Sequence, residues 1–379
     1  MKTKEKSIIA RFWRLCPARH IISLVSAAVI GAYFLLRENY MLMEKLCASV
    51  IRPYHRAVGK LCSKVDFSVA EALYAVLIIF VLAYLTVSIC LLIKRRERIK
   101  RLWLMAETLA MTALCIYAGF CVLWGVYYYG ESFSESIGIE TREISVEELY
   151  TVTAWFADKA NKYGAEIDRD ENGIYVCSRD ELLDKAESLY DEVQIDFPYL
   201  QGPLLRPKGI HFSKIMSRIN FTGFFFPFTG EANLNTDSPM CMFASTAAHE
   251  LAHQRGVATE QEANFVGIMA SMDSGDADYC YSASLLAYIH LGNALYSADY
   301  ELWEKVSGSL EDYVWDDLRD NNLYWDQFEG KAAEVSETVY TGFLQSYGQT
   351  LGMKSYGACI DLLTAYYYET AAEELEAVR

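Results

Sequence analysis

Three long apolar stretches occupy the first third of the chain, at residues 21–36, 69–93 and 102–129. A helix needs about 20 apolar residues to cross a bilayer, so the first stretch is marginal in length and the other two are ample. The first has no clear small-residue cleavage site and two more follow it, which favours a retained anchor over a signal peptide. We therefore predict an N-terminal α-helical membrane anchor with three spans, over about residues 20–37, 68–93 and 102–129, in contact with the lipid bilayer.

After residue 130 the pattern changes from continuous apolar runs to helical periodicity with capping signals. Ser145-Val-Glu-Glu148 and Ser178-Arg-Asp-Glu181 both match the capping box, in which a serine and a glutamate three residues later cap the start of a helix. They predict helices over residues 146–163 and 179–193. We therefore expect a membrane domain over 1–130 and a second domain over 131–379.

Glycines and prolines punctuate residues 197–237, where short apolar runs are typical of strands. We expect a small sheet with strands near 221–226 and 230–235; the second is placed to be an edge strand, with an ordinary connector as the alternative. The apolar run at 279–296 is flanked or interrupted by Asp278, His290 and Asn293, which predicts a buried helix and not a fourth span. The second domain is expected to be mainly α, of the α+β class.

Charge divides the chain in the same way as hydropathy. Of 34 basic and 50 acidic residues, 18 basic and 6 acidic lie up to Arg101, and the remaining 16 basic and 44 acidic lie beyond it. Such asymmetry is typical of a basic membrane anchor joined to an acidic soluble domain. A domain this acidic argues against nucleic acid as a partner.

The distribution of lysine and arginine predicts the orientation in the membrane. The N-terminal segment and the loop at 94–101 are both strongly basic, and cytoplasmic segments carry an excess of these residues. We therefore expect a cytoplasmic N-terminus and an extracytoplasmic second domain. A cytoplasmic second domain is the alternative, because the segment between the first two spans is also basic, with Lys45, Arg52, Arg56, Lys60 and Lys64.

The clearest chemical motif is His249-Glu-Leu-Ala-His253. Histidines four residues apart lie on one face of a helix, where both can bind a single metal ion. Glu250 can then act as general base towards a water on that ion. This H-E-x-x-H pattern is typical of zinc metallopeptidases, and a surface helix with an accidental spacing is the alternative. The ten cysteines show no C-x-x-C spacing, so a cysteine zinc site is not expected.

The third zinc ligand is expected from the helix that follows. Thr259 and Glu262 match a capping box that opens this helix. Glu262 falls on an apolar stripe with Phe265 and Met269, and a carboxylate on such a stripe needs a partner, which zinc would supply. A capping role alone is the alternative for Glu262, and Glu260, on another face of the helix, is the second candidate ligand.

A second donor to the reacting carbonyl oxygen is usual in zinc hydrolase sites. The candidates are His211, Tyr281 and Tyr356, which the sequence does not rank. For His211 and His290 individually, a structural role is the favoured interpretation.

The chain resembles a bacterial membrane family known as domain of unknown function 3810. The segments that carry the resemblance are Pro227-Phe-Thr-Gly-Glu-Ala-Asn233, His249-Glu-Leu-Ala-His-Gln-Arg-Gly256, Glu262-Ala-Asn-Phe265, Lys354-Ser-Tyr-Gly357 and Asp361-Leu-Leu363. The resemblance implies a zincin-like fold and a zinc metallopeptidase, with a small sheet beside the metal-binding helix. The motifs are also similar to short-spacer gluzincins that cleave repressors in bacteria, where the glutamate of E-A-N is taken as third ligand, which implies Glu262 rather than Glu260.

Residues and resemblance together predict a multi-pass protein of the bacterial cell membrane that carries a zinc-dependent peptidase domain. His249, His253 and Glu262 would bind one zinc ion, and Glu250 would be the general base in the hydrolysis of a peptide or protein substrate. The main alternative is a non-catalytic sensor or scaffold, stabilised by zinc, that binds a peptide or envelope ligand. An intramembrane protease is disfavoured, because the H-E-x-x-H segment lies in a polar domain and outside every predicted span.

Overall fold

The computed structural model describes residues 13–94, 97–139, 142–203, 205–347, 349 and 359–378. These residues are mostly helical and separate into two compact units. The first unit contains the described residues up to Ile51 together with Val69–Gly130, and the second contains Arg52–Ser68 together with the chain from Glu131 onward. Residues 52–68, which we had expected in the membrane domain, therefore pack as part of the second unit.

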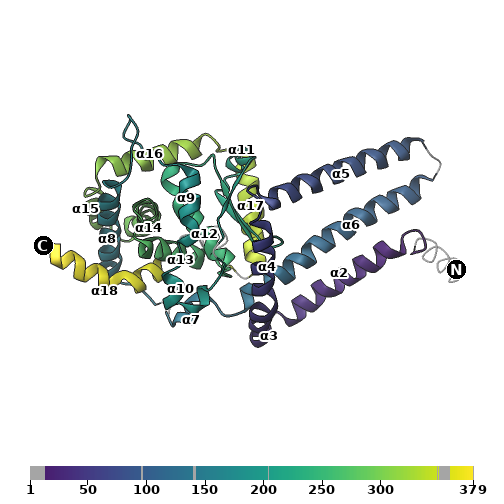
Figure 1. Cartoon of the computed structure of the whole chain (residues 1–379), viewed down its shortest axis with the longest axis horizontal. Helices are drawn as coiled ribbons and strands as arrows, with labels where there is room; N and C mark the ends of the chain where they lie inside the picture. Colours follow the sequence, from purple (N-terminus) through teal and green to yellow (C-terminus); the bar gives the residue numbers. More distant parts are fainter. Residues whose placement is uncertain are drawn as a thin grey trace. The chain divides into compact units, whose positions relative to one another are not determined.

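Three long helices make up most of the first unit (Figure 1). Its elements are α2 (Pro17–Leu36), α3 (Tyr40–Leu46), the π-helix η1 (Cys47–Ile51), α5 (Val69–Lys94), α6 (Arg98–Leu123) and the 3₁₀-helix η2 (Gly125–Tyr129). Segments of α2, α5 and α6 are long and apolar enough to cross a membrane, over Pro17–Leu36, Val69–Ile93 and Arg98–Leu123, which confirms the prediction of three such helices. The third ends at Leu123 and not near residue 129, because the chain tightens into η2 at Gly125.

Polar side chains join α2 to α6 within the first unit. Glu107 of α6 lies 3.0 Å from the Nδ1 atom of His20 and accepts a hydrogen bond of 3.0 Å from Ser23. Arg19 donates to the hydroxyl of Thr108 at 2.7 Å. Polar groups in a membrane-spanning bundle are stable when they are paired with one another, so these contacts fix the register of the two helices.

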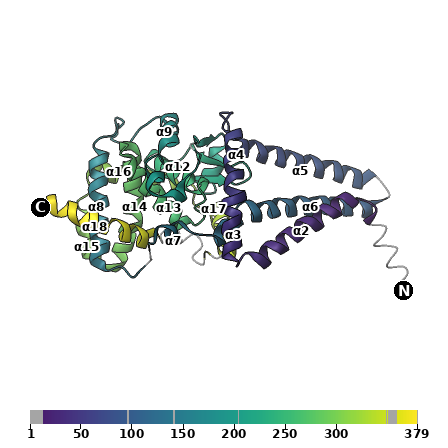
Figure 2. The same ribbon diagram turned by 60° about the horizontal axis from the view of Figure 1, so that its bottom comes forward.

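The second unit is a helical assembly with one small sheet (Figure 2). Its elements are α4 (Arg52–Cys62), α7 (Phe133–Ile137), α8 (Val146–Gly164), α9 (Arg179–Lys185), η3 (Ala186–Ser188), α10 (Val193–Asp196), η4 (Pro198–Leu200), β1 (Lys208–Ile210), α11 (Ser213–Ser217), β2 (Gly223–Phe226), β3 (Glu231–Asn235), α12 (Met240–Gln254), α13 (Glu260–Ser274), α14 (Ala277–Ala298), α15 (Tyr300–Ser307), α16 (Asp312–Asp326), α17 (Lys331–Ser346) and α18 (Ile360–Val378). The core lies where α8, α12, α13, α14 and α18 pack against one another. Most of the apolar run at 279–296 is buried within α14, as predicted.

The two predicted capping boxes have different outcomes. At the start of α8, Ser145 and Glu148 make both hydrogen bonds of the box, and the helix spans almost the predicted residues. At α9, the amide of Glu181 bonds to Ser178, but the helix ends at Lys185 instead of residue 193. The chain turns there through η3, which lets the buried Tyr190 donate to the carbonyl of Ala248 at 2.7 Å.

The sheet contains three strands in the order β1-β3-β2. β3 pairs in parallel with β1 and antiparallel with β2, and all five of its residues are buried. The prediction that residues 230–235 form an edge strand was therefore wrong, because β3 is paired on both sides. β2 is an edge strand, and its first residue, Gly223, lies beside Glu250 of α12.

Residues 52–68 are held to the sheet by buried polar contacts. The Lys208 ammonium donates to the carbonyls of Cys62 at 2.7 Å and Phe67 at 2.9 Å, and pairs with Glu231 at 2.8 Å. Ser68 donates to the side chain of Asn233 at 2.6 Å. Removal of residues 52–68 would leave the buried Lys208 without its carbonyl acceptors. The second unit therefore needs this segment as well as the residues from 131 onward to be fully packed.

Candidate metal centre

Helix α12 brings His249 and His253 together on one face. Their ring centroids are 4.6 Å apart and the rings are perpendicular. Both side chains are buried, with 8% and 6% of each residue exposed. The helix around them is rich in alanine, and Ala247, Ala248 and Ala252 are fully buried, so neighbouring helices can approach its backbone closely.

Helix α13 supplies the carboxylate that faces these histidines, from Glu260. The Oε2 atom of Glu260 lies 3.2 Å from Nε2 of His249 and 3.6 Å from Nε2 of His253. His249, His253 and Glu260 form one group of possible metal ligands. Among the described histidine, cysteine and acidic side chains, theirs are the ligand atoms that converge closely enough for one metal ion. The other oxygen of Glu260 accepts a hydrogen bond of 2.7 Å from the hydroxyl of Tyr340.

The Nδ1 atoms of both histidines are bonded to oxygen acceptors. Nδ1 of His249 lies 2.7 Å from Oδ1 of Asn264, and Nδ1 of His253 lies 2.7 Å from the carbonyl of Val257. An acceptor at Nδ1 places the N–H there in a neutral imidazole, so that the lone pair is on Nε2. Two lone pairs and the oxygen of Glu260 then point towards one another, an arrangement that repels unless a cation lies between them.

The distances from Glu260 to the two histidines are compatible with a zinc ion. Zinc binds imidazole nitrogen and carboxylate oxygen at about 2.0–2.2 Å in a tetrahedron, which places neighbouring ligand atoms about 3.3–3.6 Å apart. The two separations from Glu260, 3.2 and 3.6 Å, are close to this edge length. Contacts that hold the second nitrogen of a ligating histidine, as Asn264 and Val257 do here, are typical of metal sites.

Glu262 lies elsewhere, and the structure does not bring it to the histidines. It is buried, as predicted, but its Oε1 atom accepts hydrogen bonds from the backbone amide of Ser134 at 2.8 Å and from the hydroxyl of Ser134 at 2.6 Å. Its Oε2 atom accepts from the side chain of Thr259 at 3.1 Å, so these two side chains bond to each other and do not form the predicted capping box. The partner of the buried carboxylate is α7, and the geometry favours Glu260 as third ligand.

The sequence contains a signal that favours Glu260 over Glu262 as third ligand. Glu260, Asn264 and Gly267 are at positions i, i+4 and i+7, so they form one stripe along α13. A Cβ atom on Gly267 would lie 2.9 Å from the backbone nitrogen of His249, so glycine lets α13 pack directly against α12. The stripe with a glycine and a polar side chain faces α12. The apolar stripe that contains Glu262 faces the core.

Glu250 occupies the position expected of a general base. It is buried, and a Cβ atom on Gly223 would lie 2.8 Å from its side chain, so the glycine at the start of β2 makes room for the carboxylate. Burial raises the pKa of Glu250 to about 7, against the lowering effect of His249 and His253. Its Oε2 atom has no hydrogen-bond partner among the described residues.

The protonation of the metal-free centre is set by the contacts between the histidines and Glu260. Burial lowers the pKa of His253, but the adjacent Glu260 carboxylate outweighs it and raises the value to about 9. The pKa of Glu260 lies well below its ordinary value because His253 and His249 outweigh the effect of burial. A proton on His253 therefore takes the place of a cation near neutral pH when no metal is bound.

A cavity of about 350 Å³, which we call the cleft, opens beside His249 and Glu250. Its walls come from residues 219–223 and from α12, α13, α14, α16 and α17. Two further polar atoms in its wall, Nε2 of His290 and Oδ1 of Asn321, are buried and have no hydrogen-bond partner among the described residues. Burial and the nearby His249 lower the pKa of His290 to about 4, so its imidazole is neutral at physiological pH.

The other candidate donors have different outcomes. The hydroxyl of Tyr281 is hydrogen-bonded to Asp317, and Tyr281 is not in the wall of the cleft. His211 is exposed and is also absent from that wall. Tyr356 lies outside the described residues. His290 is the histidine that the structure adds to the site, although the sequence favoured a structural role for it.

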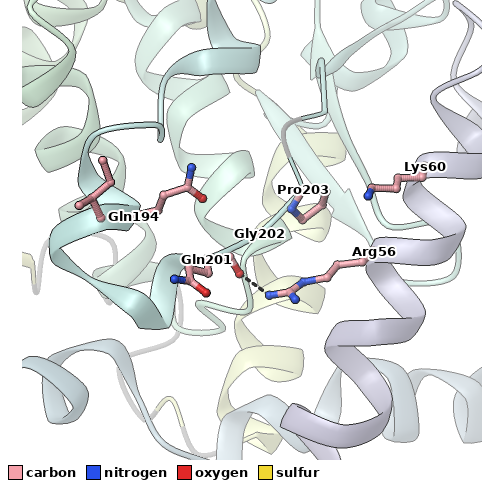
Figure 3. A pocket seen from close by; sticks show the side chains of 7 residues that line it. Arg56, Lys60, Gln194, Gln201, Gly202 and Pro203 are labelled. Atoms are coloured by element: carbon pink, nitrogen blue, oxygen red, sulfur yellow. Dashed lines mark hydrogen bonds between the residues drawn. The ribbon is translucent and has the colours of Figure 1, made fainter.

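A second hollow, of about 530 Å³, shares no residue with the cleft. Figure 3 shows it between α4 and the chain near α10, with lining residues Arg56, Lys60, Gln194, Ile195, Gln201, Gly202 and Pro203. The guanidinium of Arg56 donates to the carbonyl of Gln201 at 2.6 Å. Within the described part of the chain, the lining contains no histidine, cysteine or carboxylate, so it offers no ligand set for zinc there.

Comparisons with known proteins agree with the resemblance. Residues 49–364 match the model of a family described as "Protein of unknown function (DUF3810)". No curated protein and no solved structure shows a significant match. The matched region contains His249, Glu250, His253 and Glu260, so the whole candidate centre lies in the part of the chain that the family model covers.

Proposed function

The chain belongs to the DUF3810 family, whose function is unknown, and from the geometry of its candidate centre we propose that it is a zinc-dependent metallopeptidase with a membrane anchor. The observation that carries this proposal is the convergence of His249, His253 and Glu260, with Glu260 at 3.2 and 3.6 Å from the two imidazole nitrogens, beside the buried Glu250. This is the set of roles that metal-assisted hydrolysis requires: three ligands, an open position and a general base.

Each residue has a defined role in this proposal. His249, His253 and Glu260 hold the zinc, and Asn264 and Val257 orient the two imidazoles. Zinc, when bound, supplies a Lewis acid for the scissile carbonyl and the attacking water. Its place among the three ligands is next to the cleft, because His249 and Glu250 lie in the cleft wall.

Glu250 moves the proton of the reaction. It takes one proton from water as the water oxygen forms a bond to the carbonyl carbon, and gives it to the amine nitrogen as the C–N bond breaks. A pKa near 7 suits both steps at neutral pH, since the carboxylate can accept and then release a proton. The remaining proton leaves with the new carboxyl group.

His290 and β2 would bind the peptide group. The neutral imidazole of His290 can donate from Nε2 to the carbonyl oxygen, which gains negative charge in the transition state. β2 is an edge strand, and an extended peptide can add to such an edge through main-chain hydrogen bonds. Residues 219–223, which lead into β2, lie in the wall of the cleft.

Metal content and peptide hydrolysis, measured together, test the proposal. The full-length protein in detergent is the suitable material, because residues 52–68 pack on the sheet of the second unit. We expect the protein to contain one equivalent of zinc and to hydrolyse members of a broad peptide library. A chelator should abolish this hydrolysis, and added zinc should restore it. Stoichiometric zinc without turnover would favour a zinc-stabilised sensor, and protein without zinc would contradict the proposal.

We further propose that this is a bacterial membrane protein with a cytoplasmic N-terminus and the second unit outside. The basic segments near the spans support this orientation. A cysteine introduced at the exposed Glu143 should react with an impermeant maleimide in intact cells, above the background of the unaltered chain. Protection in intact cells, with labelling after lysis, would place the second unit in the cytoplasm.

A further inference from the structure

Part of the wall of the cleft is apolar. Met242 of α12, Leu286 and Ile289 of α14, and Trp325 of α16 contribute to its walls. Leu286 and Ile289 precede His290 on the same face of α14, so an apolar surface continues up to the polar atoms of the site. Pockets for small ligands measure about 300–1,000 Å³, so a cavity of about 350 Å³ takes only a short stretch of a peptide.

The charge at the mouth of the cleft is negative. Apart from the histidines and Glu250, the titratable side chains of its lining are Tyr340 and Glu337, and no lysine, arginine or aspartate belongs to the lining among the described residues. Glu337 is exposed, which places its carboxylate at the mouth. Glu250 adds a second carboxylate inside the same cavity.

Helix α17 turns one face towards the cleft and the opposite face away from it. Ala333, Ser336, Glu337 and Tyr340 follow the spacing of one helical face and line the cavity. Glu334, on the same helix, is also exposed but does not line the cavity. The helix therefore carries two exposed glutamates of which only one faces the site.

We propose that the cleft selects peptides that place a bulky apolar side chain on this apolar wall and a cationic group against Glu337. This inference rests on the proposed peptidase function and names its substrate class. The cation is either a lysine or arginine side chain or the free α-amino group of the peptide, because both present an ammonium or guanidinium to the carboxylate. An endopeptidase would recognise the lysine or arginine side chain, and an aminopeptidase would recognise the free α-amino group.

Peptide binding to full-length Glu250→Gln protein, loaded with zinc, tests this inference without turnover. Calorimetry compares peptides that differ in one feature at a time: leucine or serine at the position proposed to meet the apolar wall, lysine or glutamine beside it, and a free or acetylated N-terminus. The same peptides are then measured with Glu337→Lys added, and with Glu334→Lys added as the matched control on the same helix. Zinc content is recorded for every variant.

We expect the leucine peptide to bind more tightly than the serine peptide, and the cationic peptide about two- to fivefold more tightly than its neutral partner. Glu337→Lys should abolish or reverse the preference for the cation, while Glu334→Lys changes affinity less than twofold. Loss of affinity on acetylation identifies the α-amino group, and loss on replacement of lysine by glutamine identifies the side chain. An unchanged preference in Glu337→Lys, or equal binding of cationic and neutral peptides, overturns the inference.

The outcome for selectivity is separable from the outcome for catalysis. Selective binding by Glu250→Gln together with no hydrolysis by the wild type would retain the ligand class and refute the peptidase. Hydrolysis by the wild type without any preference at Glu337 would retain the peptidase and refute this inference.

Discussion

Two clusters of buried charge lie in the second unit, and they differ in how completely their atoms are paired. In the first, one oxygen of Asp317 accepts a hydrogen bond of 2.8 Å from the amide of Tyr175, and the other accepts from Arg169 at 2.9 Å and from the hydroxyl of Tyr281. Arg169 also donates to the carbonyls of Gly164 and Gly173. Every partner in this cluster belongs to the protein.

The second cluster is the candidate metal centre, where the pairing is incomplete. The Oε2 atom of Glu250, Nε2 of His290 and Oδ1 of Asn321 are buried and lack a hydrogen-bond partner among the described residues. A buried polar atom without a partner is destabilising by about 1–3 kcal/mol, so an arrangement with several of them is retained for a ligand. Complete pairing indicates a structural cluster, and convergent unpaired atoms beside a cavity indicate a site.

The largest expected effect follows from Glu250. Glu250→Gln keeps the size of the side chain but removes its ability to accept a proton, so kcat should fall by about 10²- to 10⁴-fold. Zinc content should stay at the wild-type level, because Glu250 is not a ligand in this account. Loss of zinc in this variant would show that Glu250 binds the metal, and unchanged kcat would exclude it as the base.

Loss of Asp317 from the first cluster should lower the stability of the protein without changing its zinc affinity. Asp317→Ala removes a buried carboxylate and leaves the partly buried guanidinium of Arg169, the amide of Tyr175 and the hydroxyl of Tyr281 without it, which is destabilising by about 3–5 kcal/mol and lowers the thermal midpoint by about 10 °C. Arg319→Ala breaks an exposed ion pair on the same helix and serves as control, with little change expected. A weakened zinc affinity in folded Asp317→Ala protein would contradict the separation of the two clusters.

A smaller effect is expected where a residue orients a ligand without touching the metal. Asn264→Ala removes the acceptor from Nδ1 of His249, and loss of such a contact lowers metal affinity by about 10- to 100-fold. Asn293→Ala, at an exposed position on α14, is the control. Equal zinc dissociation constants for the two variants would mean that Asn264 does not orient the imidazole.

The smallest effect, counted per pH unit, is the pH dependence of zinc affinity. Since the pKa of His253 is about 9 in the metal-free centre, zinc must displace a proton from it below that pH. Apparent affinity should therefore rise by about tenfold per pH unit up to about pH 9 and level off above it. Metal-free protein should show the opposite trend in stability: the contribution of the His253 proton is complete below about pH 6.5 and is lost as pH rises to about 9. A zinc affinity that is flat from pH 7 to 9 would contradict this linkage.

Local spacing made part of the molecule predictable. His249 and His253 lie together because a spacing of four residues brings side chains to one face of any helix. The start of α8 at Val146 followed from the capping box of Ser145 and Glu148, which depends only on residues within one turn. The three apolar helices followed from length and hydropathy.

Features that depend on long-range packing were not predictable in the same way. Burial of Glu262 followed from its apolar stripe, but its partner, Ser134, lies 128 residues away in α7, and nothing in the sequence around Glu262 identifies that partner. The edge strand was misplaced because pairing of β3 with β1 is set by tertiary contacts between residues 208–210 and 233–235. For the same reason, the contacts of Lys208 that draw residues 52–68 into the second unit are not visible in the sequence.

The choice between two glutamates on α13 is the central claim, and zinc titration of Glu260→Gln and Glu262→Gln tests it most directly. Both variants keep the size of the side chain, and both sites are buried, so the pair is matched. We expect Glu260→Gln to lose stoichiometric zinc and Glu262→Gln to retain it with an affinity close to that of the wild type. Zinc retained by Glu260→Gln and lost by Glu262→Gln would contradict the account.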